Sequence, residues 1–104
     1  MPQRKVARKL KPVHPGQVLK TVLEDAGISA NALALALRIP ANRLTAIINE
    51  QRAISADTAL RLARYFGTSA QMWMNLQAKH DLDVAEDTSA ARIETEVQPM
   101  RKAS

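Results

Sequence analysis

With 104 residues and no cysteine, the chain is expected to form one domain without a disulfide framework, a thiolate metal site or a thiol nucleophile. Only 3% of the residues are aromatic, and the predominance of Ala and Leu favours a helical core. Residues 1–80 hold 12 Lys and Arg against 4 Asp and Glu, whereas residues 81–104 hold 3 against 6. A basic body suits a polyanionic partner, and solvated surface charge is the alternative. Because no apolar run is long enough to span a membrane and no signal-peptide core is present, we expect a cytoplasmic protein without a membrane partner.

The N-terminal segment, residues 1–12, has five basic residues, no acidic residue and no apolar periodicity. It is predicted to be a flexible basic arm that contacts a nucleic-acid backbone or a partner, or stays solvated. The first helix should begin at about Pro15 and end at Gly27, since proline suits a first helical turn and glycine a left-handed cap. Its apolar stripe has helical spacing and comprises Val18, Leu19, Val22, Leu23 and Ala26.

Two short helices should follow, separated by a tight turn at Arg38 and Ile39. Ser29 is a good N-cap for the first of them, in which Leu33, Ala34 and Leu37 face inward. Pro40 opens the second, which should run to about Asn49. Two helices of this length joined in this way form a helix-turn-helix arrangement.

A fourth helix is predicted from the Ser55 cap to Gly67, and a fifth from the Ser69 cap to about His80. The expected inward residues of these two helices are Ala59, Leu60, Leu62, Ala63, Phe66, Met72, Trp73, Met74 and Leu76. Beyond His80, a weak apolar pattern predicts one or two further helical segments that fray after Pro99. We therefore expect an all-α fold with a basic arm (1–12), a helix-turn-helix domain (13–80) and an acidic, partly helical extension (81–104).

The helix that begins after Pro40 has two distinct faces. At about 100° per residue, Leu44, Ile47 and Ile48 share one face. The opposite side is suited to a DNA major groove, because Asn can bond to adenine, Arg to guanine, and Ala or the Thr methyl can pack on thymine. The alternative is an ordinary solvated helix face. The predicted base-contacting residues are Ala41, Asn42, Arg43, Thr45 and Ala46, and the predicted phosphate-contacting residues are Ser29, Asn31, Asn49 and Arg52.

The remaining candidate residues indicate structure or association. The Trp–Met stretch is expected mainly to fill the core, and Trp73, Met74 and Leu82 are the predicted surface for a homodimer or another partner. His14 and His80 have no carboxylate in metal-ligand register, so His14 is expected at a helix start and His80 at a helix end. The glycines form no phosphate-binding loop and the serines have no histidine at a suggestive spacing. We therefore expect no catalytic residue, metal or cofactor, and no enzymatic activity.

Taken together, the "HPG" at residues 14–16, "RAIS-x-x-TALRLA" from Arg52, and "FGTS" followed by "WMNLQ" closely resemble the HigA/VapI antitoxins. These antitoxins are a branch of the XRE-type, lambda-repressor-like helix-turn-helix proteins, and the resemblance covers about 70 residues. It implies a five-helix DNA-binding domain that acts in a type II toxin–antitoxin pair. Such proteins neutralise a RelE/HigB-like toxin that cuts mRNA, and as homodimers they bind double-stranded operator DNA to repress their own operon.

The resemblance also implies residue roles. It makes residues 40–49 the recognition helix and places Arg52 at a basic loop position that touches the DNA backbone. The acidic segment 81–96 is a candidate for covering a basic toxin cleft, although other helices or the arm serve equally well. Two alternatives stay open: a stand-alone transcriptional regulator without a toxin, and a protein-interaction module that has lost DNA binding.

Glu50 and Gln51 depart from the family pattern, in which Gly and a basic residue are common at these positions. A carboxylate beside DNA repels phosphate, although it can also accept a hydrogen bond from cytosine N4. If the bend requires a positive φ, a non-glycine residue costs about 1 kcal/mol. We therefore expect a lower operator affinity than in the family at large.

Overall fold

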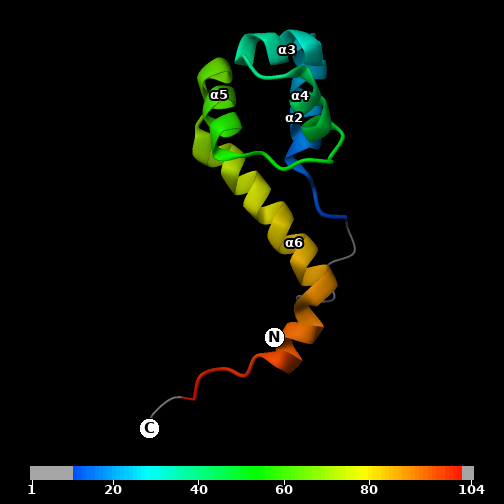
Figure 1. The fold of residues 1–104 in the computed structure, drawn as a ribbon, viewed down its shortest axis with the longest axis vertical. Coiled ribbons are helices and arrows are strands. Elements are labelled where there is room, and N and C mark those ends of the chain that lie inside the picture. The colour runs from blue at the N-terminus through cyan, green and yellow to red at the C-terminus, as the bar shows by residue number, and fades with distance from the viewer. Residues whose placement is uncertain (1–10, 102–104) are drawn as a thin grey trace.

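The computed structural model describes residues 11–101, which contain five helices and no strand. The five-helix all-α prediction is therefore confirmed (Figure 1). Residues 1–10, most of the predicted basic arm, lie outside the described residues. The helices are α2 (Pro15–Ala26), α3 (Ala30–Leu37), α4 (Ala41–Ile48), α5 (Ala56–Phe66) and α6 (Ala70–Glu96).

Serine side chains begin three of the helices, as predicted. The Oγ atoms of Ser29, Ser55 and Ser69 accept hydrogen bonds from backbone N–H groups in the first turns of α3, α5 and α6. Each bond satisfies an N–H group that has no partner within its helix. Gly27 and Gly67 end α2 and α5 in the left-handed conformation, with φ of 69° and 74°. Local sequence signals thus define both ends of α2 and α5.

The start of α2 is packed tightly against α4. His14 is 4% exposed and caps the helix, because its Nδ1 accepts a hydrogen bond from the Gly16 N–H at 2.9 Å. A Cβ on Gly16 would lie 1.9 Å from the carbonyl oxygen of Ile47, so only glycine permits this approach. The "HPG" motif therefore combines a cap with a close contact between two helices.

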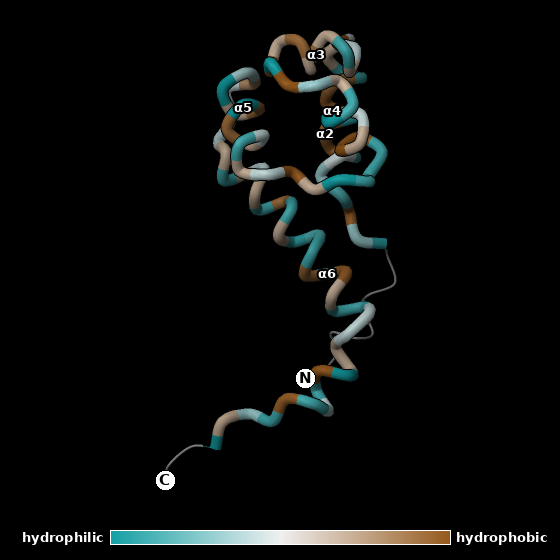
Figure 2. The backbone as a smooth tube through the Cα atoms, in the orientation of Figure 1, coloured by the Kyte–Doolittle hydropathy of each residue, from teal (hydrophilic) through white to brown (hydrophobic). Residues whose placement is uncertain are grey.

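The core lies between α2, α3, α4, α5 and the first turns of α6 (Figure 2, where brown marks hydrophobic residues). Each fully buried Leu or Ile side chain contributes about 1.5–3 kcal/mol relative to an exposed one. The predictions that Leu60 and Met72 face inward are wrong. They are 63% and 37% exposed, because α5 buries the face that carries Ala59 and Leu62 and α6 buries the face that carries Trp73. The buried hydrophobic residues are Leu19, Leu23, Leu33, Ala34, Leu37, Ile39, Leu44, Ile47, Ile54, Ala59, Leu62 and Trp73.

Helix α6 is a single helix of 27 residues, so the predicted end near His80 and the separate later segments are wrong. Only Trp73 and Gln77 of this helix are buried. Its second half projects from the domain (Figure 1), and the molecule therefore measures 58 × 30 × 21 Å. The Cα radius of gyration is 17.5 Å, whereas a globular chain of this length would have about 13 Å. The expected boundary at residue 80 falls within α6.

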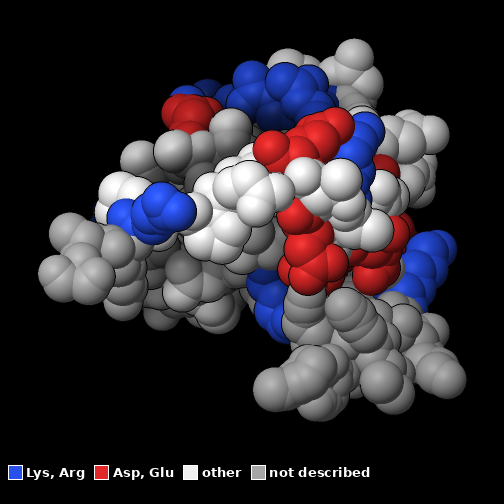
Figure 3. All heavy atoms as spheres, turned by 90° about the horizontal axis from the view of Figure 1, so that it is seen from below, with Lys and Arg blue, Asp and Glu red and all other residues white. Residues whose placement is uncertain are grey.

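Acidic side chains gather on the projecting half of α6. In Figure 3, which views the molecule from below, red side chains occupy the middle, where α6 points toward the viewer. Blue side chains lie mostly toward the edges of the same view. The acidic residues of this half are Asp81, Asp83, Glu86, Asp87, Glu94 and Glu96.

Candidate nucleic-acid interface

The two faces predicted for α4 are present in the structure. Leu44 and Ile47 are fully buried on the inner face, which packs against α2 and α3. On the outer face, Ala41, Asn42 and Thr45 are exposed, whereas Arg43 and Ala46 are half-buried. The five predicted base-contacting residues thus form an outer strip of α4, in which three side chains are exposed and two are half-buried.

Thr45 already uses its hydroxyl proton within the helix. Its Oγ1 donates to the carbonyl oxygen of Ala41 at 3.0 Å. The side chain is therefore held in one rotamer, and what it offers outward is its methyl group and an oxygen that can accept. A methyl group on this strip suits an apolar contact such as the C5-methyl of thymine.

The predicted phosphate-contacting residues lie at the start of α3, at the end of α4 and in the loop that follows α4. Ser29 accepts from the Ala32 N–H at 3.0 Å, and Asn31 is exposed in the first turn of α3. An oxygen that accepts in this way can still donate its own proton, and a helix N-terminus carries partial positive charge. Asn49 ends α4 and Arg52 follows in the next loop, and both are exposed.

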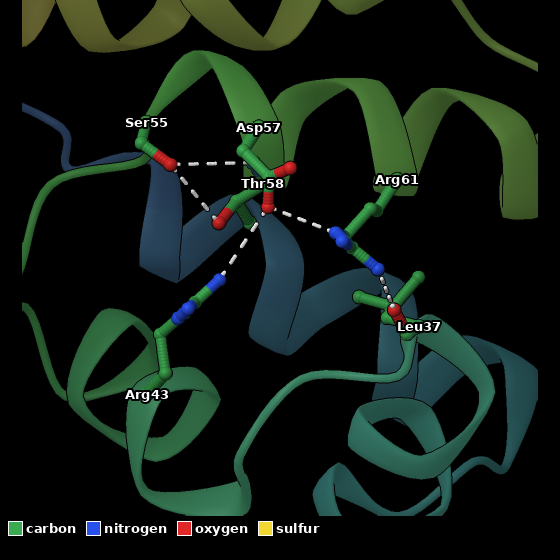
Figure 4. Close-up of polar contacts among 6 residues, drawn as sticks. All are labelled: Leu37, Arg43, Ser55, Asp57, Thr58 and Arg61. Carbon is green, nitrogen blue, oxygen red and sulfur yellow. Dashed lines mark hydrogen bonds and ion pairs between the residues drawn. The ribbon is translucent and has the colours of Figure 1, made fainter.

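Arg43 does not extend freely from α4. Its Nη1 lies 3.6 Å from Oδ2 of Asp57, in the first turn of α5 (Figure 4). The same oxygen accepts from Nε of Arg61 at 2.8 Å. The hydrogen bond from Arg61 is the main reason that the pKa of Asp57 lies below its usual value, and the charge of Arg43 lowers it further. This ion-pair cluster links α4 to α5, and the sequence did not indicate it because Arg43 lies on a different helix from Asp57 and Arg61.

The loop that contains Arg52 is attached to α6 by a buried amide. Gln77 is 5% exposed, and its Oε1 accepts from the Ile54 N–H at 2.7 Å. Its Nε2 donates to Oδ1 of Asp81 at 2.9 Å. Because Ile54 itself is buried, the loop is fixed both by packing and by a hydrogen bond. No pattern in the sequence indicates this role for Gln77, because the amide acts on a loop 23 residues earlier in the chain.

The two histidines, distant in sequence, meet in the structure. Their ring centroids are 4.8 Å apart, with the rings nearly edge to face. The pKa of His14 is lowered, first by burial and then by the nearby His80, while Glu50 and Asp81 partly oppose this shift. Within residues 11–101 no group of three or more His, Cys, Asp or Glu side chains is arranged to hold a metal ion. The pair therefore joins the start of α2 to the middle of α6, and His80 does not end a helix as predicted.

Comparison with known proteins places these features in a family. A helix-turn-helix family model matches residues 19–73. Virulence-associated protein I of Dichelobacter nodosus is 52% identical over 75 residues, which cover 71% of this chain and 69% of that protein. A HigA-family addiction module antidote protein from Coxiella burnetii is 48% identical, with a TM-score of 0.82, and the match covers 88% of this chain and 100% of that chain. The Pseudomonas aeruginosa antitoxin HigA, solved with the higBA promoter, is 47% identical over 86% of this chain and 99% of its own, with a TM-score of 0.83.

The chain belongs to the HigA branch of the XRE-type helix-turn-helix family. The structure shows the conformation of Glu50, the residue at which the sequence departs from the pattern expected of this family. Its φ is 63°, in the left-handed region that favours glycine. Its Oε2 accepts from Nε2 of Gln17 at 3.0 Å, which ties the end of α4 to α2. The expected positive φ is thus present, and the carboxylate has a partner within the protein.

Among the residues predicted for a partner surface, only Leu82 is fully on the surface of this HigA-type chain. It is 69% exposed on the projecting half of α6. The placement of Trp73 on that surface is wrong, because Trp73 is 2% exposed and its Nε1 donates to Oγ1 of Thr68 at 3.1 Å. Met74 is half-buried and packs against the core. No helix within residues 11–101 is both long and apolar enough to cross a membrane.

Proposed function

We propose that this protein is the antitoxin of a type II toxin–antitoxin pair. In this proposal it binds double-stranded operator DNA as a homodimer, represses its own operon, and neutralises a RelE/HigB-like toxin that cuts mRNA. The observation that carries the proposal is the outer face of α4, where Asn42 and Thr45 are exposed opposite the buried Leu44 and Ile47. Relatives with this fold include an antitoxin solved with a promoter and the antitoxin GraA solved with its operator.

The proposed DNA contacts follow from the chemistry of this face. Asn42 can bond through its amide to N6 and N7 of adenine, and Arg43 to O6 and N7 of guanine. Ala46 is small enough to let the helix backbone approach the groove. The start of α3, the end of α4 and the loop after α4 would contact phosphates and so set the register of the complex without selecting sequence. Their residues are Ser29, Asn31, Asn49 and Arg52.

A gel-shift assay with the DNA upstream of the protein's own gene tests the DNA-binding part. The Asn42→Ala variant should lose roughly tenfold or more in affinity, as expected for a bidentate base contact. The matched control is Asn75→Ala, an exposed asparagine on α6. Wild-type affinity should also fall steeply with salt concentration, because phosphate contacts release counterions. Equal affinities of Asn42→Ala and wild type would contradict the recognition role of α4.

A dimer would be needed to read two half-sites about one helical turn apart. The projecting half of α6 supports this assembly, because Leu82 and Ile93 line a shallow apolar groove of about 350 Å³. Both side chains are exposed in the single chain, at 69% and 48%. Sedimentation should give a dimer for the wild type and a monomer for the Leu82→Asp/Ile93→Asp double variant. A dimer that survives both substitutions would contradict the use of this groove.

The acidic half of α6 is our candidate toxin-binding surface, because an RNA-cutting toxin needs a basic cleft and opposite charges speed association. Co-expression should rescue growth from the product of the neighbouring gene. Reversing Asp87 and Glu96 to lysine should weaken the rescue, whereas reversing Glu24 and Asp25 on α2 should not. Growth arrest that persists with the wild type would favour a stand-alone regulator. That alternative has support from a 37% identical relative described as an uncharacterized HTH-type transcriptional regulator of Escherichia coli.

A further inference from the structure

Asp57, on α5, links the outer strip of α4 to α5 and, through Arg61, to the end of α3. Arg43 is the only arginine of α4, and its side chain is 28% exposed. Its Nη1 lies 3.6 Å from Oδ2 of Asp57. The contact is an ion pair that lies just beyond hydrogen-bond distance. Arg43 therefore rests against α5 at the edge of the outer face of α4 (Figure 4).

The carboxylate of Asp57 is held more firmly than the arginine it meets. Arg61 donates through Nε to the same Oδ2 at 2.8 Å, and through Nη1 to the carbonyl oxygen of Leu37 at 2.9 Å. Asp57 also lies in the first turn of α5, where the helix dipole favours a negative charge. A chain of contacts thus runs from the end of α3 through Arg61 and Asp57 to Arg43.

We propose that Asp57 is a positioning residue for base recognition: it holds the Arg43 guanidinium at the edge of α4 so that its other N–H groups meet a guanine. This inference rests on the proposed operator binding. A guanidinium has five N–H donors in a rigid fork, so one Nη can stay near Asp57 while the remaining edge bonds to O6 and N7. The arrangement requires no movement of α4 or α5.

Two physical effects would make Asp57 a determinant of sequence selectivity. An arginine whose rotamer is already restrained loses less side-chain entropy when it binds the correct base. The Asp57 carboxylate also repels DNA phosphates. It therefore weakens the sequence-independent attraction of this part of the surface for any DNA. Removing Asp57 should therefore raise binding to random DNA and lower the preference for the correct base pair.

Selection from a random duplex library tests this inference, and the operator sequence need not be known in advance. The wild type should select a motif with a guanine whose enrichment disappears in Arg43→Ala. At that one position, Asp57→Asn should lose roughly tenfold of the guanine preference, close to the value of one bidentate contact. Asp57→Glu keeps the charge but moves it by one methylene group, and it should also lose preference there. The other positions of the motif should be unchanged in both variants.

The controls separate positioning from charge and from folding. Asp25→Asn removes one exposed acidic charge on α2 and should leave the motif unchanged, and thermal melts should show that every variant is folded. In an Arg43→Ala background, Asp57→Asn should change no base preference. If the wild type selects a motif and Asp57→Asn selects the same motif with equal preference, the inference is overturned while the proposed operator binding survives. If the wild type selects no motif, the proposed operator binding fails, and the inference fails with it.

Discussion

Replacing Gly16 with alanine should show how strongly the contact between α2 and α4 determines the fold. A Cβ at this position would lie 1.9 Å from the carbonyl oxygen of Ile47 and 2.9 Å from its carbonyl carbon. Ordinary contacts begin at about 3.4 Å, so the two helices would have to separate by more than an ångström. The obstacle is backbone and cannot rotate away, and overpacking of a core typically costs about 1–3 kcal/mol or more.

Gly27→Ala is the matched control, because it makes the same chemical change without a clash. No atom lies within 4 Å of a Cβ there, but φ is 69°, so only left-handed strain of about 1 kcal/mol applies. We expect Gly16→Ala to lose about 3 kcal/mol of unfolding free energy in denaturant titrations, the upper end of that range. Since 1 kcal/mol corresponds to about 4–8 °C in Tm at this size, thermal melts should separate the two variants clearly. Equal losses in both variants would refute the argument from the Gly16–Ile47 approach.

Substitutions at three further positions test single contacts. Glu50→Gly should gain about 0.5 kcal/mol of unfolding free energy, because relief of the strain at the positive φ exceeds the loss of the hydrogen bond to Gln17. Glu50→Ala should be destabilised, and denaturant titration of both variants measures the difference. Because the pKa of His14 is lowered, the unfolded state binds more protons near pH 6, so stability should decline as pH falls below about 6.5. His14→Asn keeps an N-cap acceptor and should have a flatter profile of Tm between pH 7 and 5; an unchanged slope would contradict the assignment. Gln77→Leu leaves the buried Ile54 N–H without its acceptor and should cost about 1–3 kcal/mol, with faster hydrogen exchange at that amide; unchanged exchange would show that the bond is dispensable.

The domain was predictable because its helix ends carry strong local signals. Serine caps and left-handed glycines act within a few residues, so they can be recognised without tertiary information. Helix α6 was not predictable as one helix because its apolar periodicity weakens after His80. It continues because no proline occurs before Pro99 and because side chains four residues apart pair along it, including Lys79–Asp83 and Arg92–Glu96.

The two faces of α4 were predictable for a similar reason, since they depend on the periodicity of one helix. Its surroundings were not, because they depend on contacts between helices. Asp57 follows Arg43 by 14 positions, and nothing in that spacing indicates a contact. Trp73 has two plausible environments in the sequence, the core and an interface, because large aromatic residues are common in both. The structure decides between them by burying the ring and providing Thr68 as a partner for the indole N–H.

Glu50 involves both local backbone conformation and a contact between helices, and its backbone and its side chain have opposite effects on stability. The backbone bears the cost of a left-handed φ of 63°, which lets the Gln51 N–H reach the carbonyl oxygen of Ala46 at 2.8 Å and close the end of α4. The side chain offsets part of this cost through Gln17, and so connects the end of α4 to α2. The same carboxylate adds a negative charge beside Asn49, one of the proposed phosphate contacts. In the proposed complex with DNA, Glu50 would therefore strengthen the attachment of α4 to α2 and weaken the contact with the phosphate backbone, and sequence preference would rest on the proposed contacts of Asn42 and Arg43.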